Sequence, residues 1–364
     1  MNHDTNLHFQ DIAEDFFEVK NIINEKWLYE VEHPEELYFL FSPLNPLKEK
    51  IKSHIIVEKA KARIVCFFNP ENKINDEQIA YFGYWETIDS LEINSKMFKE
   101  CENWARDCGA TKLIGPINFS TYNRYRLNLS SPSDHPFFNE PQNPEYYPIL
   151  LENLGFKPLN EYVSYIVKDK EKIKNWISVY EQKKAILDFG YTFEKITPKV
   201  WMDNLEEIHK KSEIVFGGNF AFTPISIDLF KIKYGEFFSK LICPKTSIFV
   251  RKKDNSEIIG VLINFPNYND LPIDQRNLSN LSYENYTRKI KKPTLLMKTI
   301  GIVDGHSHMG FLVIRMLLEI AEDALAGYDE FIFCLMQKDN YPSKLGHEFK
   351  SSEKKYALYS KDLR

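Results

Sequence analysis

The sequence lacks the features that would place it in several large classes of protein. None of its apolar runs approaches the roughly 18 residues of a membrane-spanning helix, and residues 1–10 are polar, without the layout of a signal peptide. Lysine and arginine number 47 against 52 aspartate and glutamate, so no basic excess favours nucleic acid. We therefore expect a soluble, cytoplasmic protein with neither a nucleic-acid nor a membrane partner.

Cysteine is also scarce, and its arrangement argues against two kinds of site. The five cysteines are scattered and form no CxxC motif, which predicts reduced thiols and neither a disulfide framework nor a zinc site. His306 and His308 are one residue apart, but no third ligand lies nearby in the sequence. We expect no metal, and we interpret the two imidazoles as donors that face a phosphate group.

The composition that is present is that of a globular protein. The chain has 364 residues, 43% of them hydrophobic and 14% aromatic. This length exceeds one average domain, so two domains are expected, and either half is long enough to bury a core.

The most informative stretch is a strand, a turn and a helix near the C-terminus. Residues 294–303 form a mostly apolar run, 304–310 a polar turn with two glycines, and 309–325 a stretch with apolar residues at i, i+3 and i+4 spacing that Gly327 ends. The first backbone N–H groups of such a helix are unpaired and carry positive partial charge, which suits phosphate. The alternative is an ordinary strand–helix unit whose turn binds nothing.

The order of elements is repeated in the two halves of the chain. After the helix come a strand at 330–336, a turn with Asn340, a short helix around 341–345 and a final strand at 355–360. The first half follows the same order, with a helix at 90–108, a strand at 112–117, a short helix up to 154 and a closing strand at 162–167. Its helix begins with Asp89-Ser90-Leu91-Glu92, whose carboxylates would repel a pyrophosphate.

With these motifs, the chain resembles the bacterial tandem family of GCN5-related N-acetyltransferases (GNAT), whose first domain is degenerate. The pieces that carry the resemblance are Gly115-Pro116-Ile117-Asn118-Phe119-Ser120, Asn143-Pro144-Glu145-Tyr146-Tyr147, Leu154-Gly155-Phe156, and Lys355-Tyr356-Ala357-Leu358-Tyr359-Ser360-Lys361. The resemblance implies an α/β fold of two tandem GNAT-like domains, each a mixed, mainly antiparallel sheet flanked by helices. We expect a degenerate domain at 1–168, a linker helix at 169–190 and an acyltransferase domain at 191–364.

In this family the turn after the central strand wraps the pyrophosphate of acetyl-CoA or another acyl-CoA. The family's usual turn is Gln/Arg-x-x-Gly-x-Gly/Ala, and here only Gly310 matches, with Leu312 in place of the small last residue. The expected acyl-CoA contacts are Ile302, Val303, Ser307, His308, Met309, Gly310, Phe311 and Asn340.

Acyl transfer to an amine needs a deprotonated nucleophile, a donor to the thioester oxygen and an acid for the leaving thiolate. Many family members carry a glutamate on the central strand, whereas this strand offers Lys298 and Thr299. The candidate catalytic residues are Tyr341, His347, His306 and His308. The alternatives are a packed or capping role for the tyrosine and a surface position for His347.

The resemblance thus predicts transfer of an acyl group from acyl-CoA to an amine of a small molecule. Two alternatives remain: an acyl carrier protein as thioester donor, and a non-catalytic binding or scaffold protein with a GNAT-like fold. Transfer from charged tRNA is disfavoured by the net charge of −5.

Overall fold

The computed structural model describes residues 13–19, 34–42, 45, 50–130, 136–183, 190–276, 281–303 and 309–364. The chain divides into two compact units that do not follow chain order. Unit 1 comprises Met1–Glu161, Asn219–Leu229 and Lys355–Arg364, and unit 2 comprises Tyr162–Gly218 and Phe230–Lys354. The domain division expected from the sequence is consecutive along the chain and stays a prediction.

The sheet of unit 1 is built from consecutive hairpins and one parallel pair. Its strands, in spatial order, are β1 (Lys52–Glu58), β2 (Ala62–Ile74), β3 (Glu77–Thr87), β4 (Lys112–Gly115) and β12 (Ser352–Asp362), with β5 (Leu127–Asn128) beside β12. Its helices are α2 (Pro34–Phe41), α3 (Leu91–Asp107) and α4 (Tyr146–Asn153). β3 and β4 run parallel, and the other pairs are antiparallel.

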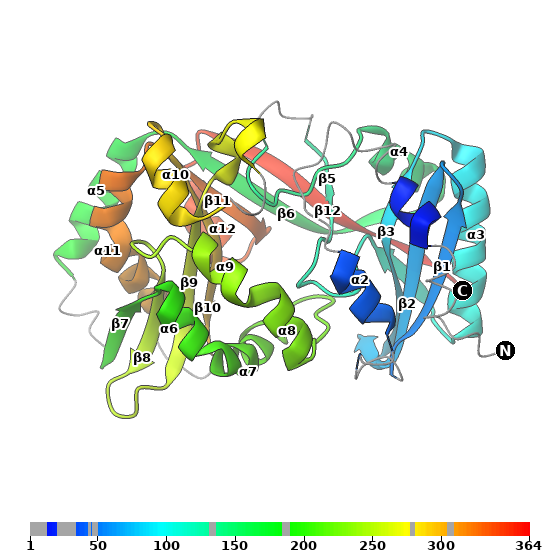
Figure 1. Ribbon diagram of the computed structural model, residues 1–364, viewed down its shortest axis with the longest axis horizontal. Coiled ribbons are helices and arrows are strands. Elements are labelled where there is room, and N and C mark those ends of the chain that lie inside the picture. Colours follow the sequence, from blue (N-terminus) through cyan, green and yellow to red (C-terminus); the bar gives the residue numbers. More distant parts are fainter. Residues whose placement is uncertain are drawn as a thin grey trace. The chain divides into compact units, whose positions relative to one another are not determined.

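Helix α3 covers one face of this sheet (Figure 1). It begins at a favourable cap, because the Ser90 hydroxyl accepts a hydrogen bond from the Ile93 amide at 3.4 Å. Met97, Phe98 and Cys101 are buried in a core shared with β2, β3 and α4. This apolar face therefore fixes the helix on the sheet.

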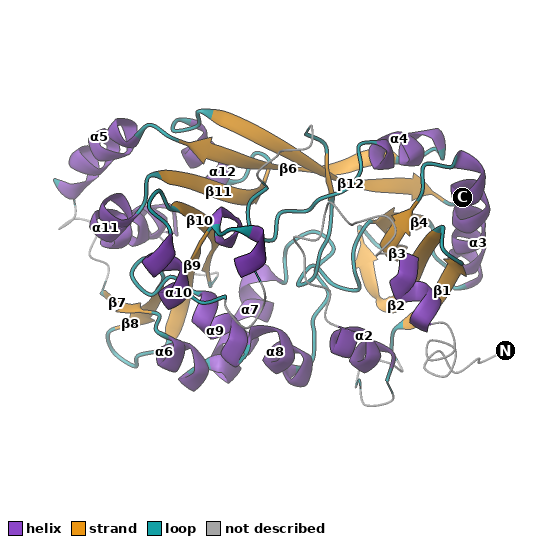
Figure 2. Cartoon of the chain, turned by 45° about the horizontal axis from the view of Figure 1, so that its top comes forward, coloured by secondary structure: helices purple, strands orange, loops and turns teal. Residues whose placement is uncertain are grey.

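Unit 2 has a six-stranded mixed sheet. Its strands, in spatial order, are β6 (Lys157–Val167), β11 (Glu330–Gln337), β10 (Thr294–Ile302), β9 (Ile258–Pro266), β8 (Ile248–Lys252) and β7 (Tyr191–Lys195). Its helices are α5 (Lys170–Glu181), α6 (Pro198–Asp203), α7 (Leu205–Phe216), α9 (Glu236–Leu241), α10 (Tyr283–Lys289), α11 (Met309–Gly327) and α12 (Tyr341–His347), with 3-10 turns η2 (Tyr268–Asp270) and η3 (Ile273–Gln275). Helix α8 (Ile227–Tyr234) has residues in both units. Figure 2 shows β6, β11 and β10 as neighbours.

Helices α11 and α7 lie on opposite faces of this sheet. Ile302 packs with Leu312 and Met316 of α11 in one core cluster. The adjacent residue, Gly301, lies against Val215 and Phe216 of α7. Successive residues of a strand point to opposite faces, so the end of β10 is covered by α11 on one side and by α7 on the other.

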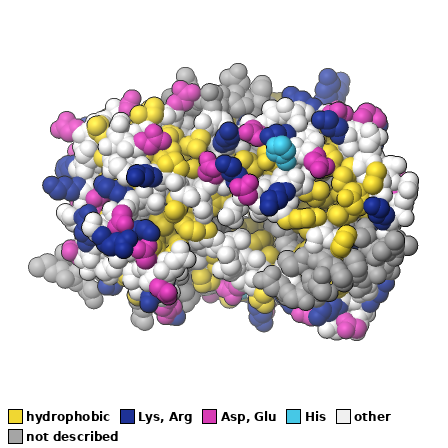
Figure 3. Space-filling view, turned by 180° about the vertical axis from the view of Figure 1, so that it is seen from behind, with side chains coloured by type: hydrophobic (Ala, Val, Ile, Leu, Met, Phe, Trp, Pro, Cys, Tyr) yellow, Lys and Arg dark blue, Asp and Glu magenta, His cyan; other side chains and the backbone are white. Residues whose placement is uncertain are grey.

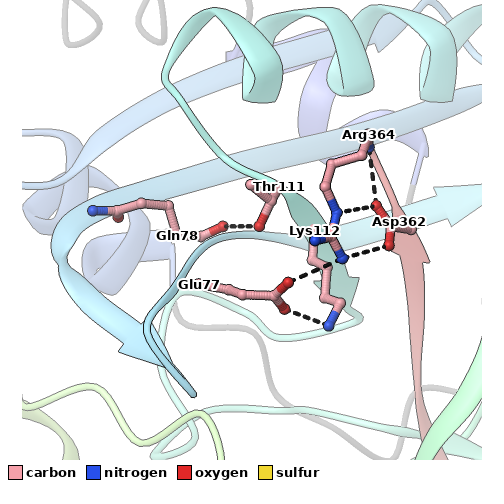
Figure 4. A network of polar contacts seen from close by, with 6 residues as sticks. All are labelled: Glu77, Gln78, Thr111, Lys112, Asp362 and Arg364. Carbon is pink, nitrogen blue, oxygen red and sulfur yellow. Dashed lines mark hydrogen bonds and ion pairs between the residues drawn. The ribbon is translucent and has the colours of Figure 1, made fainter.

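Each unit is closed by a strand from the other half of the sequence. Tyr162 to Val167 of β6 pair with β11 in unit 2, whereas Tyr359 to Asp362 of β12 pair with β4 in unit 1. Side chains hold β12 in place as well, as Figure 4 shows. Arg364 pairs with Asp362 at 2.9 Å and with Glu77 of β3 at 3.0 Å, and Glu77 also pairs with Lys112.

These observations confirm the predicted α/β class with mixed, mainly antiparallel sheets flanked by helices. None of the helices in the described part of the chain is long and apolar enough to cross a membrane. Basic and acidic side chains are interspersed on the face drawn in Figure 3.

Candidate functional site

The candidate site begins where the parallel strands β10 and β11 stop pairing and separate. The two strands pair in parallel over only four positions, from Thr294 opposite Glu330 to Met297 opposite Phe333. Both strands continue beyond this point, β10 to Ile302 along β9 and β11 to Gln337 along β6. A V-shaped separation of the two backbones is therefore built into the sheet.

A β-bulge lies on each strand immediately after the last parallel pair. On β10, the register shifts between Met297 and Thr299, so that Lys298 is the extra residue opposite β9. On β11, Cys334 and Leu335 lie opposite the single residue Ser164 of β6. Bulges bend a strand and increase its twist, so this pair of bulges accounts for the divergence of the strands.

The first turn of α11 lies at the end of β10. Leu312 is 1% exposed and packs with Ile302 in the core, so the residue that departs from the family pattern points inward from this turn. Phe311, by contrast, is 52% exposed. The Val303 amide donates to the Ile259 carbonyl at 2.8 Å, which fixes the residue that leads into the turn.

The structure brings Tyr341 and Gly310 together, although they are far apart in sequence. The Tyr341 hydroxyl donates to the Gly310 carbonyl at 3.2 Å. A Cβ on Gly310 would lie 3.4 Å from the tyrosine ring. Burial, and secondarily Tyr180, raises the pKa of Tyr341, so the phenol keeps its proton at neutral pH.

The other predicted residues on α12 have structural partners. The Asn340 side chain caps the helix by accepting from the Ser343 amide at 2.9 Å. His347 lies at the opposite end of α12 from Tyr341, with its ring 5.9 Å from that of Tyr165. The structure does not bring His347 to Tyr341, and its catalytic role stays a prediction.

Three predicted residues of the turn, His306, Ser307 and His308, lie outside the described residues. Met309 begins α11, and its side chain is likewise outside the description. Within the described part of the chain, no group of three or more His, Cys, Asp and Glu side chains is arranged to hold a metal ion.

The sequence did not predict that α7 packs on the other face of β10. A Cβ on Gly301 would lie 2.5 Å from Val215 Cγ1 and 3.3 Å from the Phe216 ring, so the strand needs glycine for this close approach. A glycine within a strand pattern is the one sequence signal for such a contact. It does not reveal which helix makes the contact.

Unit 1 contains a corresponding parallel pair, β3 and β4. The unit's own chain occupies the position beyond the last paired residues of these strands. After Gly115 the chain turns toward β3, and the Ile117 amide donates to the Phe82 carbonyl at 2.7 Å. The Asn118 side chain accepts from the Tyr84 amide at 2.6 Å. We call this segment, residues 116–119, the plug of unit 1.

The turn that leads to α3 is also occupied by side chains of unit 1. The Thr87 amide donates to the Tyr147 hydroxyl at 2.9 Å, and that hydroxyl donates to the buried carboxylate of Glu86 at 2.8 Å. The Tyr146 hydroxyl donates to the Thr87 carbonyl at 2.7 Å. Two tyrosines and a carboxylate thus form a hydrogen-bonded group with the backbone at the end of β3, just before the turn to α3.

Comparisons with known proteins return structures but no sequence relatives. No family model matches the chain, and no curated protein matches it. Among solved structures, it is similar to a tandem GNAT protein from the clavulanic acid biosynthesis pathway, with 9% identity, a TM-score of 0.48, and coverage of 97% of this chain and 96% of that one.

Two further structures illustrate the range of similar proteins. A GCN5-related N-acetyltransferase from Sphaerobacter thermophilus has 11% identity and a TM-score of 0.40, covering 91% of this chain and 86% of that one. L-PGS from Bacillus licheniformis has 12% identity and a TM-score of 0.37, covering 95% of this chain and 90% of that one. The first two of these three structures are named as GNAT proteins, the family that the sequence motifs resemble. These likenesses concern the fold and not the reaction.

Proposed function

We propose that this protein is an acyltransferase that moves an acetyl or other acyl group from acyl-CoA to an amine of a small molecule. The observation that supports this best is the parting of β10 and β11 after Met297 and Phe333, at the strand end where α11 begins. A substrate that lies between the two strands can reach both faces of the sheet there. The first turn of the helix offers donors for phosphate.

The residues at this place fit an acyl-CoA. Gly310 and the exposed Phe311 lie in the first turn of α11, where backbone N–H groups would bind the pyrophosphate. Ile302 is buried, so it would contribute through its backbone. We keep Val303, Ser307, His308, Met309 and Asn340 as further proposed contacts.

Tyr341 is the proposed acid. In the reaction the amine nitrogen forms a bond to the acyl carbon, the carbon–sulfur bond breaks, and the leaving thiolate takes up a proton. A phenol that keeps its proton at neutral pH and is 44% exposed can supply that proton. The amine loses one proton in the same reaction, and His306, His308 and His347 stay the proposed acceptors.

Isothermal titration with acetyl-CoA, longer acyl-CoAs and free CoA tests the proposal. We expect a dissociation constant on the order of micromolar for at least one acyl-CoA. The preferred acyl chain would then be used in a screen of amine acceptors. Failure of every CoA compound to bind would overturn the proposal and would favour a carrier-protein thioester as donor.

A non-catalytic binding protein is the second candidate, because β10 offers no carboxylate as a base. In that case CoA should raise the melting temperature, since a ligand that binds only the folded state stabilises it. No amine should then be acylated. Acyl transfer to any amine at a rate above that of buffer would reject this candidate.

A further inference from the structure

The bulge on β11 depends on a side chain from the neighbouring strand. Between the pairs Phe333–Tyr165 and Met336–Val163, β11 has two residues where β6 has only Ser164. Leu335, the second of the two, has a φ of +53°. This left-handed conformation is unfavourable for a leucine and persists only where its surroundings hold it.

Ser164 supplies the hydrogen bond that accompanies this conformation. Its hydroxyl oxygen accepts from the Leu335 amide at 2.8 Å, and its side chain is fully buried. A strand residue would ordinarily offer its backbone carbonyl to the facing amide. At the bulge the two backbones are out of register, and the serine hydroxyl replaces the backbone carbonyl as the acceptor for the Leu335 amide.

We propose that Ser164 is a positioning residue of the candidate site, because its hydroxyl fixes the β11 bulge and so keeps β11 apart from β10. The inference rests on the proposed function, since the parted strands are where acyl-CoA would bind. Ser164 belongs to the half of the sequence that was expected to be degenerate. That half therefore supplies a residue on which the acyl-CoA site of unit 2 depends.

The hydrogen bond between Ser164 and Leu335 matters because the bulge lies directly after the last parallel pair. The last parallel pair is Met297 with Phe333, and the bulge begins at the next residue of β11. Loss of the hydroxyl removes the acceptor that holds Leu335 in its left-handed conformation. We expect β11 to sample a straighter course next to β10, which narrows the space between the strands.

The test compares Ser164→Ala, Ser164→Thr and Ser239→Ala in the full-length chain. Ser239 is a matched control, because it is 1% exposed and its hydroxyl donates to the Glu236 carbonyl at 2.7 Å within α9. The two readouts are acetyl-CoA and CoA affinity by titration, and hydrogen–deuterium exchange of peptides that contain Leu335. Calorimetry shows whether each variant remains folded.

We expect Ser164→Ala to bind acetyl-CoA and CoA about tenfold more weakly and to exchange the Leu335 amide about tenfold faster. Ser164→Thr, which keeps a hydroxyl, should restore both values, and Ser239→Ala should change neither. Unchanged affinity in Ser164→Ala, or an equal loss in Ser239→Ala, would overturn the inference. If the wild-type protein binds neither compound, the proposed function fails, and unaltered exchange at Leu335 would separately show that Ser164 does not fix the bulge.

Discussion

Units 1 and 2 each place a parallel pair of strands next to a long helix, yet they differ in what lies beyond the last paired residues. In unit 1 the plug bonds to β3 through Ile117 and Asn118, and Tyr147 bonds to the turn before α3. In unit 2 both strands bulge apart, and Thr299 to Gly301 pair with β9 alone among the described residues. The same arrangement is thus bonded internally in unit 1, and in unit 2 it is where we propose that a ligand binds.

The two units also differ in which backbone groups next to the long helix already have side-chain partners. At Thr87 the amide and the carbonyl both have tyrosine partners. At Gly310, Tyr341 donates a hydrogen bond to the carbonyl only. A phosphate is itself an acceptor and would not bind that carbonyl. A helix start alone therefore does not distinguish a binding unit from a structural one.

The largest effect is expected from substitutions at the helix starts. Gly310→Trp places a large side chain against Tyr341, and we expect acyl-CoA affinity to fall by more than about 100-fold. Leu91→Trp is the matched control, since Leu91 begins α3 and is 45% exposed. Titration of both variants measures the difference. Equal affinities would show that the helix start in unit 2 is not the site.

A second difference is expected between the glycines of the two central strands. A Cβ on Gly83 would collide with the backbone of the plug at Ile117 and Asn118, whereas one on Gly301 would meet side chains of α7. Backbone yields less than side chains, so Gly83→Ala should lower the free energy of unfolding by about 2–3 kcal/mol and Gly301→Ala by about 1 kcal/mol.

Calorimetry and urea unfolding measure these two variants. Gly218→Ala serves as a control, because no atom lies within 4 Å of the added Cβ. If Gly83→Ala were as stable as this control, the plug would not be packed against β3 as described.

A third prediction separates the tyrosines of the two units. Tyr147→Phe removes the hydroxyl that donates to Glu86 and accepts from Thr87, and should cost about 2–3 kcal/mol because the carboxylate is buried. Tyr341→Phe should cost less than about 1 kcal/mol, since Tyr341 is 44% exposed.

The same pair also distinguishes a structural from a catalytic tyrosine. If Tyr341 is the acid, Tyr341→Phe should lower kcat about 100-fold with little change in KM. Loss of stability without loss of kcat would instead assign it a packing role.

The smallest effect is expected on the stability of the protein at acidic pH. Asp362 in unit 1 pairs with Arg364, and Glu257 in unit 2 pairs with Lys211 and Lys252; these partners lower the pKa of each carboxyl to about 2. A lowered pKa contributes stability above the ordinary values of 3.8 and 4.5, and that contribution is lost as pH falls toward 2. Asp362 is exposed and Glu257 is only half-buried at the surface, so the effect is small.

Melting temperatures measured between about pH 6 and pH 2 test this prediction. Asp362→Asn in unit 1 and Glu257→Gln in unit 2 should each make the melting temperature fall less steeply as the pH is lowered. Identical profiles for wild type and both variants would contradict it.

The sequence predicted those parts of the site that depend on local patterns. The order of β10, α11, β11 and α12 follows from apolar periodicity and from the Asn340 cap, whereas the expectation that the acidic start of α3 binds no phosphate stays a prediction. The bulges at Lys298 and Leu335 could not be predicted, because they arise from pairing with β9 and β6. The hydroxyl of Ser164 has no signal in its own segment, since its partner is 171 residues away.

The exchange of closing strands also sets the order in which the protein can be completed during synthesis. β4 is made early, but its partner residues, Tyr359 to Asp362, are among the later ones translated. The growing chain must therefore carry the unpaired edge of β4 while most of unit 2 is made. Unit 2 faces no such delay, because Tyr162 to Val167 are already present when β11 is translated. Unit 2 is thus complete at Lys354, whereas unit 1 needs the residues that follow it.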